Sequence, residues 1–331
     1  MRVERARAGQ RRDVPSLVES ARSGDPRAVA RLISLVEDAS PRLREVAAAL
    51  IPYAGQAEVI GITGAPGVGK STCTSALVTA YRRAGRRVGV LAVDPTSPFS
   101  GGALLGDRVR MQEHATDPDV FIRSMATRGH LGGLAWATPQ ALRVLDAAGC
   151  EVILVETVGV GQSEVEVAGL ADTTLVLLAP GMGDAVQVAK AGLLEVGDVY
   201  VVNKADRDGA DRVGRDLRHM LALGEHREGS WIPRIVRTVA TTGDGIDAVV
   251  DAVTQHRAYL RESGELARRR TRRAHDEIAE LTLVDLRKRL DLLPHDRRLD
   301  ALAERVVAGE LDPYQAADEL VAEVLGAPSP S

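Results

Sequence analysis

The chain contains few aromatic residues and carries little net charge. Aromatic side chains make up 3% of its 331 residues, whereas hydrophobic residues as a whole make up 45%. A core must therefore be built from Ala, Val, Leu and Ile, which is typical of a parallel sheet covered by helices. The net charge of −4 provides no overall attraction to nucleic acid.

Cysteine and long apolar segments are equally scarce. Cys73 and Cys150 are far apart and lack metal-ligand spacing, which argues against a disulfide framework or a zinc module and favours a reducing cytosol. No uncharged apolar run reaches the ~18 residues of a membrane span. The basic N-terminal stretch has no apolar segment of the kind found in secretory signals. We therefore expect a cytoplasmic protein with no membrane and no nucleic-acid partner.

Short β-rich runs alternate with helical stretches along the middle of the chain. Helical periodicity over residues 14–52 predicts about three short helices before this region. Strands are predicted at 58–63, 87–93, 120–124, 151–156, 173–178, 198–203 and 234–240. Helical patterns follow from about residue 244. The chain is thus predicted to be an α/β protein with a mostly parallel sheet, its main domain at 58–255 lying between helical extensions at 1–57 and 256–331.

A glycine-rich segment links the first predicted strand to a helix. It reads Gly64-Ala65-Pro66-Gly67-Val68-Gly69-Lys70-Ser71-Thr72 and matches G-x-x-x-x-G-K-[ST] in full. Glycines let backbone N–H groups turn toward the phosphates, and the helix N-terminus adds partial positive charge. Lys70 is expected to bridge phosphate oxygens, and the Ser71 hydroxyl to ligate Mg²⁺. The context predicts a P-loop NTPase rather than a ligand-free turn.

A second motif, Asn203-Lys204-Ala205-Asp206, follows the strand predicted at 198–203. The Asp206 carboxylate can accept hydrogen bonds from guanine N1–H and its exocyclic amine, a donor pair that adenine lacks. Lys204 can cover the base with its aliphatic stem, and Asn203 can tether loops. Thr241 and Thr242, after the next strand, are placed to offer backbone N–H groups to the base oxygen. The motif predicts GTP and GDP as ligands; the alternative is an acid that caps a helix.

Acidic residues follow two further strands. Asp94, and after it Asp107, can reach Mg²⁺ directly or through water, although Asp94 could also start a turn and Asp107 could cap a helix. Glu156 occupies the Walker-B position, from which it can contact Mg²⁺ through water. Gly159 can present its N–H to the γ-phosphate. Gln162 is not adjacent to Gly159, and we therefore predict slow intrinsic hydrolysis.

Two basic features have competing interpretations. Lys190 follows the glycine-containing loop 180–187 and can reach an acid of the first switch, or it is a surface helix lysine. An arginine run at 268–273 is better explained as a solvated helical face than as an anionic partner's binding surface.

Six segments together resemble a known family. GAPGVGKST, VDPTSPFSGGALLGDRVRM, RSMATRGHLGGL, ETVGVGQSE, PGMGDAVQ and NKAD, in this order and spacing, resemble the MeaB/ArgK family. These are methylmalonyl-CoA mutase-associated GTPases of the SIMIBI class of P-loop proteins. By this resemblance, Lys70, Ser71, Asp94, Asp107 and Glu156 match the Mg²⁺–phosphate residues, Asn203 and Asp206 the guanine readers, and Lys190 the lysine of a third switch.

The resemblance implies a biological role that the residues themselves do not. Family members act as chaperones of the adenosylcobalamin-dependent mutase, gate cofactor loading with GTP and help to exchange damaged cobalamin. They form homodimers through C-terminal helices, and their N-terminal helices and mobile loops contact the mutase. Some members carry the label of arginine/ornithine transport kinases, but this sequence lacks the protein-kinase catalytic set.

Three other functional classes predict different features. An ATP-dependent kinase would need an adenine site, which the guanine-reading motif disfavours. A nickel-inserting metallochaperone GTPase would carry His or Cys clusters near the switches, whereas the two cysteines here are isolated and the seven histidines are scattered. A scaffold with a dead nucleotide site is disfavoured by the intact loop with Lys70 and Ser71.

Overall fold

The computed structural model describes residues 13–38, 40–95, 111–114, 116–127, 137–157, 163–182, 192–224, 229–289 and 297–325. The chain divides into two compact units, Met1–Ala267 and Arg268–Ser331. The division at 267/268 differs from the predicted boundary at 255/256, which lies within helix α10 (Ile246–Glu262). His256 and Leu260 of that helix are fully buried in the first unit, so the whole helix belongs to it.

A seven-stranded sheet forms the centre of the first unit. Its strands are β1 (Glu58–Gly64), β2 (Val88–Pro95), β3 (Val120–Thr127), β4 (Val152–Thr157), β5 (Thr173–Leu178), β6 (Val199–Val202) and β7 (Arg234–Arg237). They lie in the order β3-β2-β4-β1-β5-β6-β7, and every pair is parallel. The predicted α/β fold is confirmed, and each predicted strand run overlaps an observed strand.

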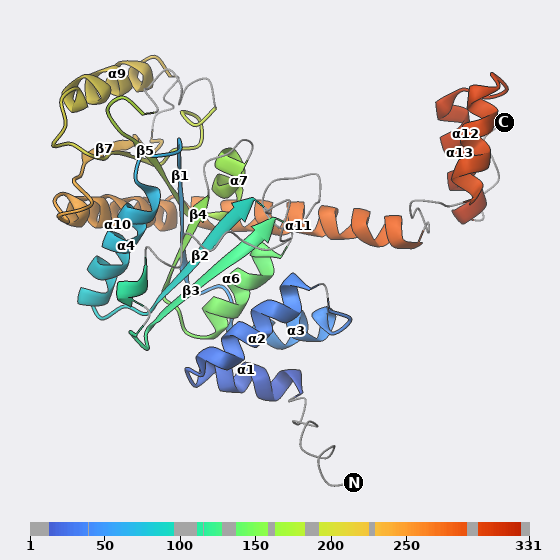
Figure 1. Ribbon diagram of the computed structural model, residues 1–331, viewed down its shortest axis with the longest axis horizontal. Helices are drawn as coiled ribbons and strands as arrows, with labels where there is room; N and C mark the ends of the chain where they lie inside the picture. Colours follow the sequence, from blue (N-terminus) through green and yellow to red (C-terminus); the bar gives the residue numbers. More distant parts are fainter. Residues whose placement is uncertain are drawn as a thin grey trace, which may run out of the picture. The chain divides into compact units, whose positions relative to one another are not determined.

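Helices cover both faces of this sheet (Figure 1). One face packs against α4 (Lys70–Arg83) and α10, and the other against α6 (Thr138–Ala147), α7 (Ser163–Leu170) and α9 (Ala210–Ala222). Alternation along β1 shows why: Ile60 and Ile62 belong to the core under α4, while Val59 belongs to the core on the opposite face. Strands buried on both faces read as continuous apolar runs, which is the pattern seen in the sequence.

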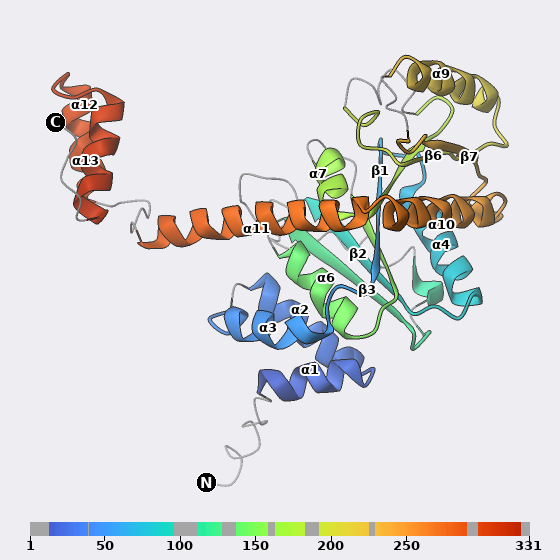
Figure 2. The same cartoon turned by 180° about the vertical axis from the view of Figure 1, so that it is seen from behind.

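The N-terminal extension shares the core of the sheet. It consists of α1 (Val14–Arg22), α2 (Pro26–Glu37), α3 (Leu43–Leu50) and the short turn η2 (Ile51–Tyr53). Asp13 and Asp25 cap the first two helices by accepting hydrogen bonds from backbone N–H groups, each beside a proline in the first turn. In both views of the chain these helices lie against α6, with which they form one hydrophobic cluster (Figures 1 and 2).

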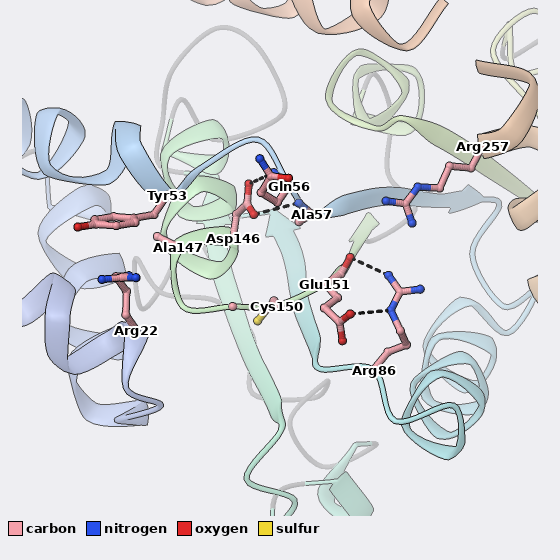
Figure 3. Close-up of a pocket in the computed structure, with 11 residues that line it drawn as sticks. Arg22, Tyr53, Gln56, Ala57, Arg86, Asp146, Ala147, Cys150, Glu151 and Arg257 are labelled. Atoms are coloured by element: carbon pink, nitrogen blue, oxygen red, sulfur yellow. Dashed lines mark hydrogen bonds and ion pairs between the residues drawn. The ribbon is translucent and has the colours of Figure 1, made fainter. Parts of the chain in front are cut away.

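A single carboxylate fastens the end of this extension to α6. Asp146 accepts hydrogen bonds from the backbone N–H groups of Gly55, of Gln56 at 3.2 Å and of Ala57 at 2.9 Å (Figure 3). These three residues lead directly into β1, the strand that is followed by the phosphate loop (64–72). Asp146 therefore fixes the point where the extension joins the sheet.

Replacing Asp146 by alanine should destabilise the first unit. Hydrogen bonds to a charged acceptor contribute about 1.5–3 kcal/mol each and are not additive, so we expect a loss of about 2–3 kcal/mol in the free energy of unfolding. Urea denaturation of the full chain measures this loss. The matched control is Asp251→Ala, because Asp251 is exposed on α10 and its replacement should change stability by less than about 0.5 kcal/mol. Equal effects of the two substitutions would contradict the tether.

The second unit is helical. It contains most of α11 (Glu265–Arg289), together with α12 (Arg297–Val307) and α13 (Pro313–Leu325). Leu302, Ala316 and Leu320 form a small core between α12 and α13, and Arg305 bonds to Glu319 at 2.6 Å beside it. Within the described part of the chain, none of the helices combines the length and apolar character that a membrane span requires.

Candidate functional site

The phosphate loop joins β1 to α4 at the carboxyl edge of the sheet, as the sequence predicts. Two of its glycines have no substitute there. Gly64 has φ 137°, and a Cβ would lie 2.3 Å from the Leu177 carbonyl oxygen; Gly69 has φ 97°, and a Cβ would lie 2.5 Å from Asn203 Nδ2. Both glycines allow a backbone approach that any side chain would block.

Lys70, the first residue of α4, is directed back along this loop. Its Nζ donates to the carbonyl oxygens of Gly64 at 2.6 Å and Ala65 at 3.2 Å, and the residue is only 8% exposed. The ammonium group is thus held inside the loop whose backbone would surround the phosphates. A lysine so placed can supply positive charge to phosphate oxygens without a large rearrangement.

Ser71 and Glu156 meet beneath the loop. Ser71 Oγ donates to Glu156 Oε1 at 2.6 Å, and Glu156 is 1% exposed. The contact follows from the topology, because β1 and β4 are neighbours and Ile62 is in register with Glu156. Hydroxyl and carboxylate oxygens are ligands that Mg²⁺ prefers, so this pair fits a Mg²⁺ site that substrate phosphates would complete.

Glu156 also influences the nearby thiol. Burial, and secondarily the charge of Glu156, raise the pKa of Cys73 to about 12. The thiol is therefore protonated at neutral pH, which argues against a reactive thiolate in α4.

Asn203 is the first residue of the base loop (203–206) and connects this loop to the phosphate loop. Its Nδ2 donates to the Val68 carbonyl oxygen at 2.9 Å, while its Oδ1 accepts from Thr238 Oγ1 and from the backbone N–H of Ala240, both at 3.1 Å. The residue is 2% exposed, so each of these bonds is shielded from water. Three segments that are distant in the sequence are thereby held in one arrangement.

The next residues of the motif form the rim of the site. Lys204 has a φ of 56°, and among the described residues it alone adopts positive φ without being glycine. Its Nζ donates to the Gly67 carbonyl oxygen at 2.7 Å, which stretches its stem from the base loop to the phosphate loop. Asp206 is exposed beside it, where a base can reach its carboxylate. Such a strained backbone at a loop of this kind points to function.

The two predicted threonines differ in their availability. Both are exposed in the turn after β7, but the N–H of Thr242 already donates to the Val239 carbonyl oxygen at 3.0 Å. The Thr242 hydroxyl also donates to Asp244 at 2.8 Å. The expected contact from this turn to the base oxygen therefore rests on Thr241.

Several predicted residues lie outside the described part of the chain. These are Asp107, Gly159, Gln162 and Lys190. Asp94 belongs to β2, two residues beyond Ala92, which is in register with Glu156, and of Asp94 only the backbone is described. The backbone register nevertheless brings Asp94 to the same edge of the sheet as Glu156.

A contact that the sequence does not predict fastens α4 to the turn η3 (Gln112–His114). Ser75 Oγ donates to the Glu113 carboxylate and lies 3.0 Å from His114 Nε2. Ser75 lies four residues after Ser71, so both face the same side of the helix. No local pattern announces this contact, because its partners are separated by 38 and 39 residues.

A protein family and several individual proteins are similar to this chain in sequence. The family model described as "Methylmalonyl Co-A mutase-associated GTPase MeaB" matches residues 29–293. A putative GTPase of Pyrococcus abyssi is 48% identical over 287 residues, which are 86% of this chain and 89% of that protein. The mouse protein named "Methylmalonic aciduria type A homolog, mitochondrial" is 37% identical over 266 residues, covering 79% of this chain and 64% of the mouse protein.

A solved structure is similar over nearly the whole chain. It is the crystal structure of a protein named "LAO/AO transport system kinase", and it superposes with a TM-score of 0.70 at 28% sequence identity. The match covers 94% of this chain and 97% of that one. The similarity extends the family relationship from sequence to fold.

Proposed function

The chain belongs to the MeaB family of GTPases, and we propose that it binds and hydrolyses GTP as a chaperone of an adenosylcobalamin-dependent methylmalonyl-CoA mutase. In this role it gates cofactor loading and protects or reactivates the mutase. GTP hydrolysis serves as a timer that switches loops between two states.

The observation that carries the nucleotide assignment is the junction made by Asn203 and Lys204. Asn203 bonds to Val68 and Lys204 to Gly67, so the guanine-reading motif is built directly onto the phosphate loop. One ligand that has both a guanine base and a chain of phosphates satisfies both halves. Adenine would leave the Asp206 carboxylate without its two donors, which disfavours an ATP-dependent kinase.

The residues then divide the work of hydrolysis. Lys70 neutralises charge on the transferred phosphate, and the loop N–H groups orient the phosphate chain. Ser71 and Glu156, with Asp94 and Asp107, would hold Mg²⁺, which supplies charge neutralisation on the phosphates when bound. Gly159 would present its N–H to the γ-phosphate, and Lys190 would respond to the partner. Because Gln162 is displaced from Gly159, the intrinsic rate is slow and the partner raises it.

The choice of partner rests on the relatives. The family description names methylmalonyl-CoA mutase, and the mouse relative is named for methylmalonic aciduria. The described part of the phosphate and base loops carries no feature that would select a mutase.

We also propose that the chain forms a homodimer through the second unit. Ile278, Leu281, Leu283 and Leu286 of α11 are all exposed, as is Val307 at the end of α12. Apolar side chains grouped on one helix are typical of a surface that another chain covers. Analytical ultracentrifugation of the full chain tests this, and a monomer at micromolar concentration would refute it.

Hydrolysis measured with and without the mutase tests the chaperone role. We expect slow phosphate release by the chain alone and a rise of about tenfold or more with saturating methylmalonyl-CoA mutase, because a partner can complete a catalytic site. A tenfold rise corresponds to a reduction of about 1.4 kcal/mol in the activation free energy. An unrelated acyl-CoA enzyme is the control. If the mutase neither binds to the chain nor raises its rate of hydrolysis, the mutase is not the partner, whereas the GTPase assignment is unaffected.

A further inference from the structure

The turn after β5 lies between the two halves of the nucleotide site. β5 pairs with β1, which carries the phosphate loop, and with β6, which leads into the base loop. The carboxyl end of β5 therefore emerges between these loops. Met182 closes the turn there, with its backbone N–H donating to the Ala179 carbonyl oxygen at 3.1 Å.

The Met182 side chain contacts both loops. Its Sδ lies 3.5 Å from Lys204 Nζ, and 3.0 Å from the position that a Cβ on Gly67 would occupy. The same Lys204 ammonium donates to the Gly67 carbonyl oxygen. Met182, Gly67 and Lys204 thus meet at one point, although they come from three different loops. Met182 remains 41% exposed, so it forms part of the rim and not of the core.

We propose that Met182 is a positioning residue for guanine-nucleotide binding, acting through Lys204. This inference rests on the proposed function, in which the aliphatic stem of Lys204 covers the face of the guanine base. The lysine stem has four rotatable carbons, and ordering it on a ligand costs entropy. Sulfur and carbonyl oxygen together fix the ammonium end before the base arrives, which reduces that cost.

The thioether suits this position. It is polarisable and accepts a weak hydrogen bond, yet its apolar surface can pack directly on the Cα of Gly67. A glycine at 67 permits this packing, because a Cβ would press against the sulfur. Leucine would reproduce the packing but not the acceptor. The two contributions of Met182 can therefore be separated by substitution.

Titration with a fluorescent GDP analogue tests the inference on the full chain. We expect Met182→Ala to weaken GDP affinity about fivefold, equivalent to about 1 kcal/mol at about 1.4 kcal/mol per tenfold. Met182→Leu should weaken it about twofold and carries the test if the alanine variant does not fold. Since the contact concerns the base half of the site, KM for GTP should rise while kcat stays unchanged.

A double-mutant cycle with Lys204→Ala separates positioning from general packing. The effect of Met182→Ala should disappear when Lys204 is already alanine. A loss that persists in that background, or no loss in the single variant, would overturn the inference. Met220→Leu, on α9, is the matched control and should bind GDP like the wild type. If the wild-type chain itself fails to bind GDP, the proposed function fails instead, so the two failures are distinguishable.

Discussion

Replacing Lys70 by alanine is expected to abolish GTP turnover while leaving the fold intact. The Lys70 ammonium is a positive charge held within the phosphate loop, against the Gly64 and Ala65 carbonyl oxygens. Removing one such group from a preorganised site costs about 10²–10³ in kcat, and more where charge on a phosphate must be neutralised. On the slow intrinsic rate proposed here, a loss of about 10³ leaves no measurable turnover.

The fold should survive because the Lys70 side chain contributes little to the core. Its Nζ bonds to carbonyl groups of the loop, and water can replace it there once the side chain is shortened. Single-turnover phosphate release measures activity, and thermal unfolding measures stability. Arg83→Ala, at the other end of α4, removes the same charge from an exposed ion pair with Asp247 and should leave hydrolysis unchanged. Retained hydrolysis in Lys70→Ala would rule out the phosphate site.

The central strands β1, β4, β5 and β6 were predictable from the sequence because burial on both faces produces continuous apolar runs. The run at 173–178 matches β5 at both ends, whereas the run at 234–240 ends as a strand at Arg237. The difference has a local cause. The N–H of Val239 donates to the Asp244 carbonyl oxygen across a turn, and the N–H of Ala240 donates to the Asn203 side chain, so the chain leaves the sheet here and supports the base loop. Tertiary hydrogen bonds to Asn203 outweigh the β propensity of the residues after Arg237.

The two nucleotide motifs were predictable because their chemistry is local. A phosphate loop needs glycines and a lysine within about nine residues, and the base reader needs about four. Their junction was not predictable in detail, since the bonds from Asn203 to Val68 and from Lys204 to Gly67 span 135 and 137 residues. The contacts of Met182 and Ser75 were not predictable for the same reason. Met182 stands in one of the family-like segments and Ser75 in none, but each acquires its role from strand order and helix packing.

The boundary of the last domain shows a further limit. Helical periodicity continues from about residue 244 to the end of the chain, so it does not reveal where one packed unit stops. The structure answers through burial: His256 is fully buried beside β5, with Nδ1 at 2.9 Å from Thr173 Oγ1. α10 is therefore part of the sheet's own covering layer, and the division falls in α11 at 267/268.

Asp206→Asn should shift the base preference of the site from guanine toward xanthine. The Asp206 carboxylate is expected to accept from guanine N1–H and the exocyclic amine. Asparagine keeps one acceptor and replaces the other with an NH₂ donor, which faces the amine of guanine but complements the O2 oxygen of xanthine. Sites built on such hydrogen bonds discriminate by up to about 10⁴–10⁵, so we expect GDP affinity to fall at least about a hundredfold and xanthosine diphosphate to bind more tightly than GDP.

Competition between the two nucleotides measures this switch. The matched control is Asp208→Asn, which makes the same chemical change on an exposed side chain two residues further along the loop. It should leave the preference for GDP unchanged, because the N-K-x-D motif assigns the contact with the base to Asp206. The substitution at Asp206 should not disturb Asn203 or Lys204, whose bonds to the phosphate loop do not involve it. Unchanged GDP affinity in Asp206→Asn would show that another group reads the base, and would remove the strongest argument for guanine over adenine.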